Sequence, residues 1–138
     1  MARTRFVAEV LTPEGQVFND EVEMVSTRTA VGSIGILAGH EPVLARLEPT
    51  ELRLYRSETE IVRYAQAEGY LQVADKHVLV LVEEAIEPGR LDSAALTERV
   101  AAARRAIEAA PEGSEQAARA AVDLRRSEAF LAIAGAPR

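Results

Sequence analysis

The chain has 138 residues, of which 48% are hydrophobic and 28% charged, and its net charge is −6. This composition is typical of one soluble globular domain, or of a small domain with an appendage, and it excludes a disordered chain. The acidic balance argues against a nucleic-acid partner. Because the chain has no cysteine and only two histidines, disulfides, a thiolate nucleophile and a multi-histidine metal site are all excluded, and we expect no metal.

No stretch of the sequence approaches the roughly 18 apolar residues of a membrane-spanning helix. The first ten residues lack the apolar run of a signal peptide. We therefore expect a cytoplasmic protein that does not itself cross a membrane.

Composition changes near Pro88-Gly89. Residues 1–87 carry a net charge of −7 and 9 alanines, whereas residues 88–138 carry a net charge of +1 and 16 alanines. This shift predicts two domains, one over residues 1–87 and one over residues 88–138.

Residues 1–87 alternate with a period of two, which is typical of half-buried strands. Expected strands are separated by turn sequences such as Thr12–Gly15 and Ser57–Glu60. The run Val78–Val82 is apolar throughout, so we expect a strand covered on both faces. Many short strands at such spacings predict an antiparallel β-sandwich.

Residues 88–138 change to a helical period. The first helix is expected to bury a stripe of apolar residues behind an N-cap at Asp92, and the second follows a cap at Ser114 and ends at Gly135. The expected stripes are Leu96, Val100, Ala103, Ile107 and Ala110 in the first helix, and Ala117, Ala121, Leu124 and Leu131 in the second. The fold class is therefore mixed, with a β-sandwich followed by an antiparallel two-helix hairpin.

The segment from Gly32 to Pro42, Gly-Ser-Ile-Gly-Ile-Leu-Ala-Gly-His-Glu-Pro, is the most unusual in the chain. It lacks the Gly-Lys-Ser/Thr ending and the glycine spacing of a phosphate-binding loop, so we interpret it as a tight double turn. His40 has no neighbouring nucleophile in the sequence. The adjacent Glu83 and Glu84 would point to opposite faces of a strand. No catalytic constellation emerges, and we expect no enzyme activity of the chain by itself.

The same segment closely resembles the signature of the epsilon subunit of F-type ATP synthases, bacterial type, in which a GEIGILPGH-like stretch precedes a small residue and proline. Three further segments resemble that family in the same order: Thr12–Phe18, Glu68–Val73, and Val78–Ala85 leading to Leu91-Asp92. The resemblance covers almost the whole chain. It departs from the family at Ser33, where a glutamate is usual, and at Ala38, where a proline is usual.

Some family members bind ATP through an Ile/Leu-Asp-x-x-Arg-Ala motif. This chain keeps Leu91 and Asp92 but has Ala95 and Leu96 in place of the arginine and alanine, so the motif is vestigial. Arg99 and Arg126 are the candidates to replace the lost guanidinium. We expect no cofactor and no ATP binding at micromolar concentrations.

The resemblance implies a non-catalytic subunit of the central stalk, peripheral to the cytoplasmic face of the cell membrane. Its sandwich would bind the gamma subunit and the c-ring, and its hairpin would reach the alpha/beta catalytic head when extended and inhibit ATP hydrolysis. The implied partner interface includes Gly32, Ser33, Ile34, Ile36, His40 and Pro42. The alternative is a free-standing β-sandwich binding module with a helical tail.

Overall fold

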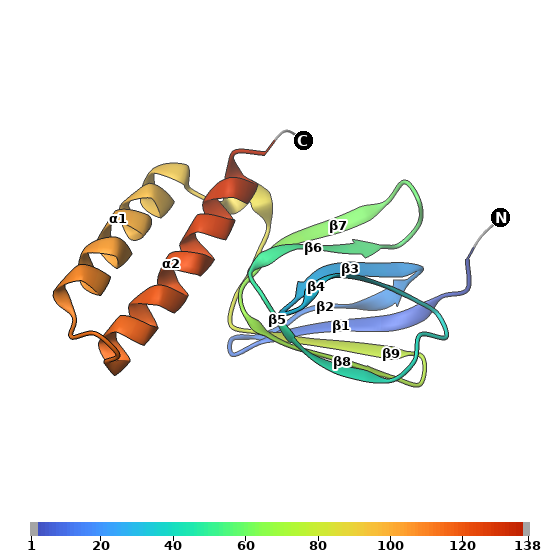
Figure 1. Ribbon diagram of the computed structural model, residues 1–138. Coiled ribbons are helices and arrows are strands. Elements are labelled where there is room, and N and C mark those ends of the chain that lie inside the picture. Colours follow the sequence, from blue (N-terminus) through green and yellow to red (C-terminus); the bar gives the residue numbers. More distant parts are fainter. Residues whose placement is uncertain (1–2, 137–138) are drawn as a thin grey trace. The chain divides into compact units, whose positions relative to one another are not determined.

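The computed structural model describes residues 3–136. The chain divides into two compact units at Glu87/Pro88, the first built of strands and the second of helices (Figure 1). The expected fold class, a β-sandwich followed by a helical hairpin, is confirmed.

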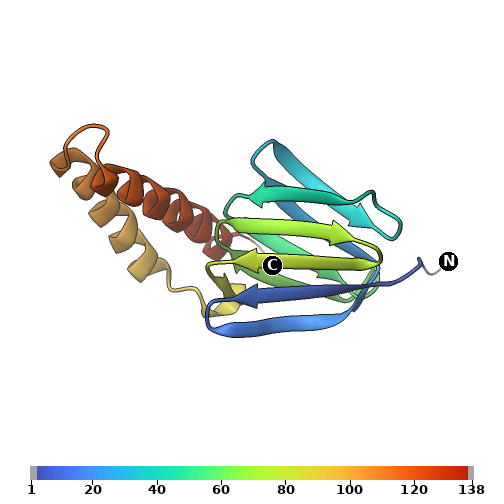
Figure 2. The same ribbon diagram turned by 90° about the horizontal axis from the view of Figure 1, so that it is seen from below.

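The first unit is a ten-stranded sheet that folds over on itself into two layers (Figures 1 and 2). One layer has the strand order β5-β8-β9-β1-β2, and the other has the order β10-β7-β6-β3 with β4 paired to the free side of β3. The strands are β1 (Phe6–Thr12), β2 (Gly15–Val22), β3 (Met24–Thr29), β4 (Gly32–Leu37), β5 (Val43–Leu47), β6 (Thr50–Tyr55), β7 (Ile61–Gln66), β8 (Gly69–Ala74), β9 (His77–Val82) and β10 (Ala85–Ile86).

Most neighbouring strands are antiparallel, as expected, and four of these pairs are joined by short hairpins. The exception is the parallel pair β1 and β9, which are more than sixty residues apart in the sequence. The two layers are joined at one edge by a single pair, Thr29 with Leu47.

The inward-facing side chains of both layers form one apolar core. Its fully enclosed members lie on seven of the ten strands: Ala8, Val10, Val22, Val25, Ile36, Leu52, Leu54, Leu71, Val78 and Val80. The side chains of β9 alternate between buried and more exposed positions, and Leu81 is 41% exposed, so the strand is covered on one face only. The expectation of a doubly covered strand at Val78–Val82 is therefore wrong.

Two buried polar side chains tie elements of the sandwich together. Gln66, which is fully buried, accepts a hydrogen bond from Thr27 Oγ1 at 2.6 Å and donates one to the carbonyl of Glu48 at 2.9 Å. Tyr64 donates its hydroxyl to the carbonyl of Val17 at 3.1 Å, which links β7 to β2. Burial raises the pKa of Tyr64 above its ordinary value.

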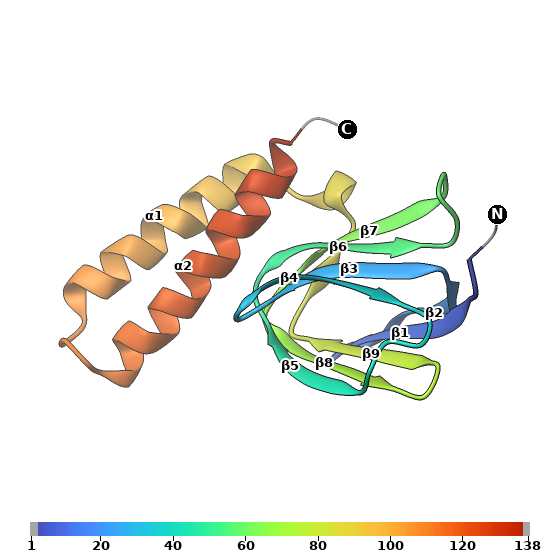
Figure 3. The same ribbon diagram turned by 45° about the vertical axis from the view of Figure 1, so that its right-hand side comes forward.

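The second unit begins with the short turn η1 (Pro88–Arg90) and continues as α1 (Ser93–Ala109) and α2 (Glu115–Ala134), two helices that run side by side in opposite directions (Figure 3). The N-caps are as expected: Asp92 Oδ1 accepts from the Ala95 amide and Ser114 Oγ accepts from the Ala117 amide, each at 3.1 Å. Helix α2 ends at Gly135.

The buried stripe of α1 follows the prediction at Leu96, Val100 and Ala103. The stripe of α2 does not. Its buried residues are Ala120, Ser127, Phe130 and Ile133, whereas all four predicted positions are only half-buried. Because α2 has apolar residues on most of its circumference, its sequence pattern selects no single face.

Candidate functional site

The segment Gly32–Pro42 forms an edge strand and a turn instead of a double turn. Residues 32–37 are β4, paired with β3 along its whole length. Left-handed φ values occur at Gly32 (+135°) and Gly39 (+82°), where a side chain would be strained. These two glycines therefore allow the chain to turn, as expected. The prediction of a double turn is therefore wrong for residues 32–37. It gave more weight to the glycines than to the alternation of Ile34 and Ile36, which indicates a strand.

The predicted interface residues of this segment divide between core and surface. Ile36 is 1% exposed and belongs to the core, and Ile34 is half-buried against it. The Ile36 side chain therefore packs into the core, which argues against its place in the expected interface. Ser33 and Pro42 are exposed, and His40 is half-buried with Nδ1 2.7 Å from the carbonyl of Glu41.

An apolar outer face lies on the layer formed by β5, β8, β9 and β1, which Figure 2 shows as a continuous sheet. Tyr70 is paired with Leu81, and Leu81 with Leu11, so these side chains form a row across three strands. Leu44 on β5 is 73% exposed and Tyr70 is 53% exposed. We define the outer face by the outward-pointing Leu11, Leu44, Tyr70, Leu79 and Leu81, of which Leu11 and Leu79 are half-buried.

The outer face is unusual because outward positions of a solvated sheet are normally polar. Arg46 and Glu9 stand at its margins, and Gln72 lies within it between Leu44 and Leu79. A cluster of large apolar side chains bordered by polar groups marks a protein interaction site. This face was not predicted from the sequence, although the uninterrupted apolar run Val78–Val82 is its signal.

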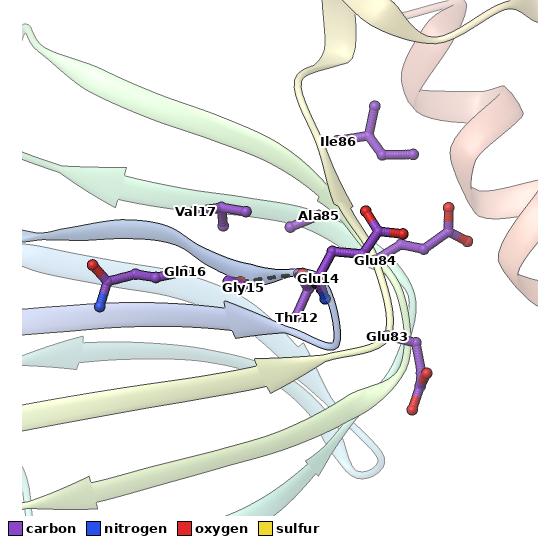
Figure 4. A pocket seen from close by; sticks show the side chains of 9 residues that line it. All are labelled: Thr12, Glu14, Gly15, Gln16, Val17, Glu83, Glu84, Ala85 and Ile86. Carbon is purple, nitrogen blue, oxygen red and sulfur yellow. Dashed lines mark hydrogen bonds between the residues drawn. The ribbon is translucent and has the colours of Figure 1, made fainter.

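Glu83 and Glu84 lie at a pocket of about 350 Å³ at the end of the sandwich (Figure 4). The β1–β2 turn forms one side and residues Glu83–Ile86 form the other. Figure 4 shows the two carboxylates directed away from each other, as expected for adjacent residues. This arrangement does not bring them to one substrate atom.

The candidate ATP-binding residues of the hairpin have structural partners. The Asp92 carboxylate caps α1, and Arg99 donates from Nη2 to Asp123 Oδ1 at 2.7 Å. Ala95 is exposed on the first turn of α1, and Arg126 is half-buried on α2. A second link between the helices joins Arg104 to Glu128 at 3.2 Å. Arg99 and Arg104 thus serve the packing of the hairpin.

Within residues 3–136, no three histidine or carboxylate side chains gather in a way that would hold a metal ion. Neither described helix is long and apolar enough to cross a membrane.

Similarity to known proteins covers most of the chain. The family profile described as ATP synthase, Delta/Epsilon chain, beta-sandwich domain matches residues 5–88. The ATP synthase epsilon chain of Halalkalibacterium halodurans is 34% identical over 122 residues, which is 88% of this chain and 86% of the relative. That of Rubrobacter xylanophilus is 32% identical over 112 residues, 81% of this chain and 76% of the relative.

The fold is also similar to that of a chain in the solved Euglena gracilis mitochondrial ATP synthase. The TM-score is 0.79 at 22% identity, covering 93% of this chain and 80% of that one. The similarity extends through both the strands and the helices. On the match of the profile to more than half of the chain, and on relatives that align over most of it, this chain belongs to the ATP synthase delta/epsilon chain family.

Proposed function

We propose that the chain is the epsilon subunit of an F-type ATP synthase and acts as a non-catalytic part of the central stalk. In this role it transmits the proton-driven rotation of the c-ring through the gamma subunit to the catalytic head, at the cytoplasmic face of the cell membrane. Family membership supports the identity of the subunit, and the solved Euglena structure with a similar chain includes a c-ring. The same membership favours a subunit of a complex over a free-standing binding module.

The observation that carries the proposal is the apolar outer face. Leu44, Tyr70 and Leu81 expose large apolar surface on a unit whose net charge is −7. Covering such side chains contributes about 25 cal/mol per Å² of apolar area removed from water. We assign this face to the gamma subunit, because a rotor subunit needs a permanent, tightly packed contact in order to transmit torque.

The segment around β4 is assigned to the remaining stalk contacts. At the turn between β3 and β4, Val31 is 98% exposed, and Ser33, His40 and Pro42 follow it at or near the surface. A fully exposed valine at the tip of a hairpin has no role in the core of the sandwich. We propose that this segment touches the c-ring.

The outer face is tested by binding of the full-length chain to the purified gamma subunit. Leu44→Asp and Leu81→Asp should each weaken binding by more than tenfold, because each places a charge in a desolvated contact. Val31→Asp is the matched control: it adds the same charge at an exposed apolar residue outside the outer face and should leave gamma binding unchanged. Equal binding by all three variants would exclude the outer face as the gamma contact.

The hairpin is the candidate inhibitor of ATP hydrolysis. It forms its own compact unit, and helices rich in alanine keep their structure comparatively well when they detach. A chain ending at Glu87 should therefore still bind gamma while the assembled enzyme hydrolyses ATP faster. Hydrolysis at the rate of the full-length complex would contradict the inhibitory role.

A further inference from the structure

Gln72 is a polar side chain enclosed within the apolar outer face. Its partners in register are Leu44 on β5 and Leu79 on β9, and Tyr70 and Ala74 flank it two positions away on β8. Side chains on one face of a sheet meet these neighbours first. Leucine side chains therefore lie on both sides of Gln72, and its carboxamide stands inside the face and not at its margin.

The Gln72 carboxamide is exposed and makes no hydrogen bond within residues 3–136. Such a group has two N–H donors and an oxygen that accepts. Glu9, at the margin of the outer face, differs in this respect. Its Oε2 accepts from Gln16 Nε2 at 2.6 Å, and its Oε1 lies 3.5 Å from His77 Nε2. The polar group at the margin is thus paired within the chain, whereas the one inside the face is left to solvent.

A partner that covers the outer face displaces the solvent from Gln72. An amide that loses its hydrogen bonds to water and gains none in exchange weakens association by about tenfold or more. A tight contact on this face therefore requires a hydrogen-bonding group of the partner opposite Gln72.

We propose that Gln72 determines the specificity and the register of the gamma contact, which rests on the function proposed above. The group of gamma that faces it is a peptide unit or a carboxamide, since such a group pairs with the donor and the acceptor of Gln72 at once. Burial of leucine side chains is non-directional and tolerates sliding. A hydrogen-bonded amide pair has a fixed geometry, so it holds gamma at one position along the face.

Gln72→Met tests the proposal through the sign of its effect on binding of the full-length chain to purified gamma. Methionine has the same unbranched length and no carboxamide, so this variant makes the centre of the face wholly apolar. Apolar burial alone would make the variant bind more tightly. We expect binding at least tenfold weaker instead. Gln116→Met, the same change at an exposed position of α2, is the matched control and should bind like the unaltered chain.

A second measurement observes the carboxamide itself. In a complex of the ¹⁵N-labelled chain with unlabelled gamma, the Nε2 protons of Gln72 should exchange with solvent at least tenfold more slowly than in the free chain. Their signals are identified by their absence from the spectrum of Gln72→Met, and the dispersion of that spectrum shows that the variant is folded.

Equal or tighter binding by Gln72→Met, or unchanged exchange of the carboxamide protons in the complex, would overturn the proposal. Leu44→Asp separates this failure from that of the proposed function. Loss of binding by Leu44→Asp together with full binding by Gln72→Met would leave the outer face as the gamma contact and reject only the role of Gln72. Full binding by both variants would reject the contact as well.

Discussion

Gly69 shows how a single residue decides the pairing of two strands. It is the first residue of β8, and a Cβ at this position would collide with the backbone oxygen of Leu81 and lie 2.8 Å from Cα of Val82. Backbone cannot move aside as a flexible side chain can, so the β8–β9 pair requires glycine here. The Gly-Tyr-Leu sequence that resembles the family is therefore explained by close approach of the backbone.

Gly69→Ala should destabilise the sandwich by more than about 3 kcal/mol, because the strands must separate to admit the methyl group. Gly35→Ala is the control, since a methyl group there would meet no atom within 4 Å and the φ of Gly35 is not in the left-handed region. Chemical denaturation of both variants measures the difference. Similar unfolding free energies would show that β9 can shift to accommodate the methyl group.

Individual caps were predictable from the sequence, whereas individual buried polar residues were not. Asp92 and Ser114 act through amides three residues away, so their function is visible in local sequence. Glu23 and Gln66 depend on groups from distant strands. Nothing near either residue in the sequence indicates its burial.

Among the elements, local pairing followed from the sequence and long-range pairing did not. The Ser57–Glu60 turn joins β6 to β7 as expected, since a short loop fixes an antiparallel neighbour. The parallel pairing of β1 with β9 needs a contact between Ala8 and Val78 that no local pattern specifies. The outer face depends on this pairing, because it places Leu11 beside Leu81. The sequence therefore predicted the class of the fold but not its apolar outer face.

The hairpin contains two serines with opposite expected effects on its stability. Ser127 is fully buried in α2, and its Oγ is the one completely enclosed side-chain polar atom among the described residues that has no hydrogen-bond partner. Ser114 caps the same helix through the Ala117 amide. One hydroxyl therefore costs stability and the other contributes it.

Ser127→Ala should stabilise the hairpin by about 1 kcal/mol, because it removes an unsatisfied hydroxyl and improves helix propensity. Ser114→Ala should destabilise it by about 1 kcal/mol through loss of the cap. Hydrogen exchange of α2 amides in the full-length chain measures both changes. Destabilisation by Ser127→Ala would mean that its hydroxyl has a partner in solution.

At the scale of the whole molecule, the two units differ both in net charge and in the functions that we propose for them. The strongly acidic unit holds the outer face and the β4 segment, which we assign to stalk partners. The helical unit carries a net charge of +1, and two of its arginines, Arg99 and Arg104, form part of the packing between α1 and α2. Exposed ion pairs of this kind compete only weakly with a phosphate, so the residue at position 95 decides more about the response of the chain to ATP.

The full-length chain should not bind ATP at micromolar concentrations. Ala95 cannot provide the guanidinium of the ATP motif that the resemblance implies, and Arg99 is paired with Asp123 at 2.7 Å. Loss of a charge-assisted contact of about 1.5–3 kcal/mol weakens affinity by about one to two orders of magnitude. Titration calorimetry with and without magnesium measures this directly.

Asp123→Asn releases Arg99 and serves as the comparison: no binding by either protein is expected, because the cation missing at position 95 is still absent. Micromolar binding by the unaltered chain would show that other arginines have taken over the phosphate contact, and the hairpin would then regain a nucleotide-sensing role.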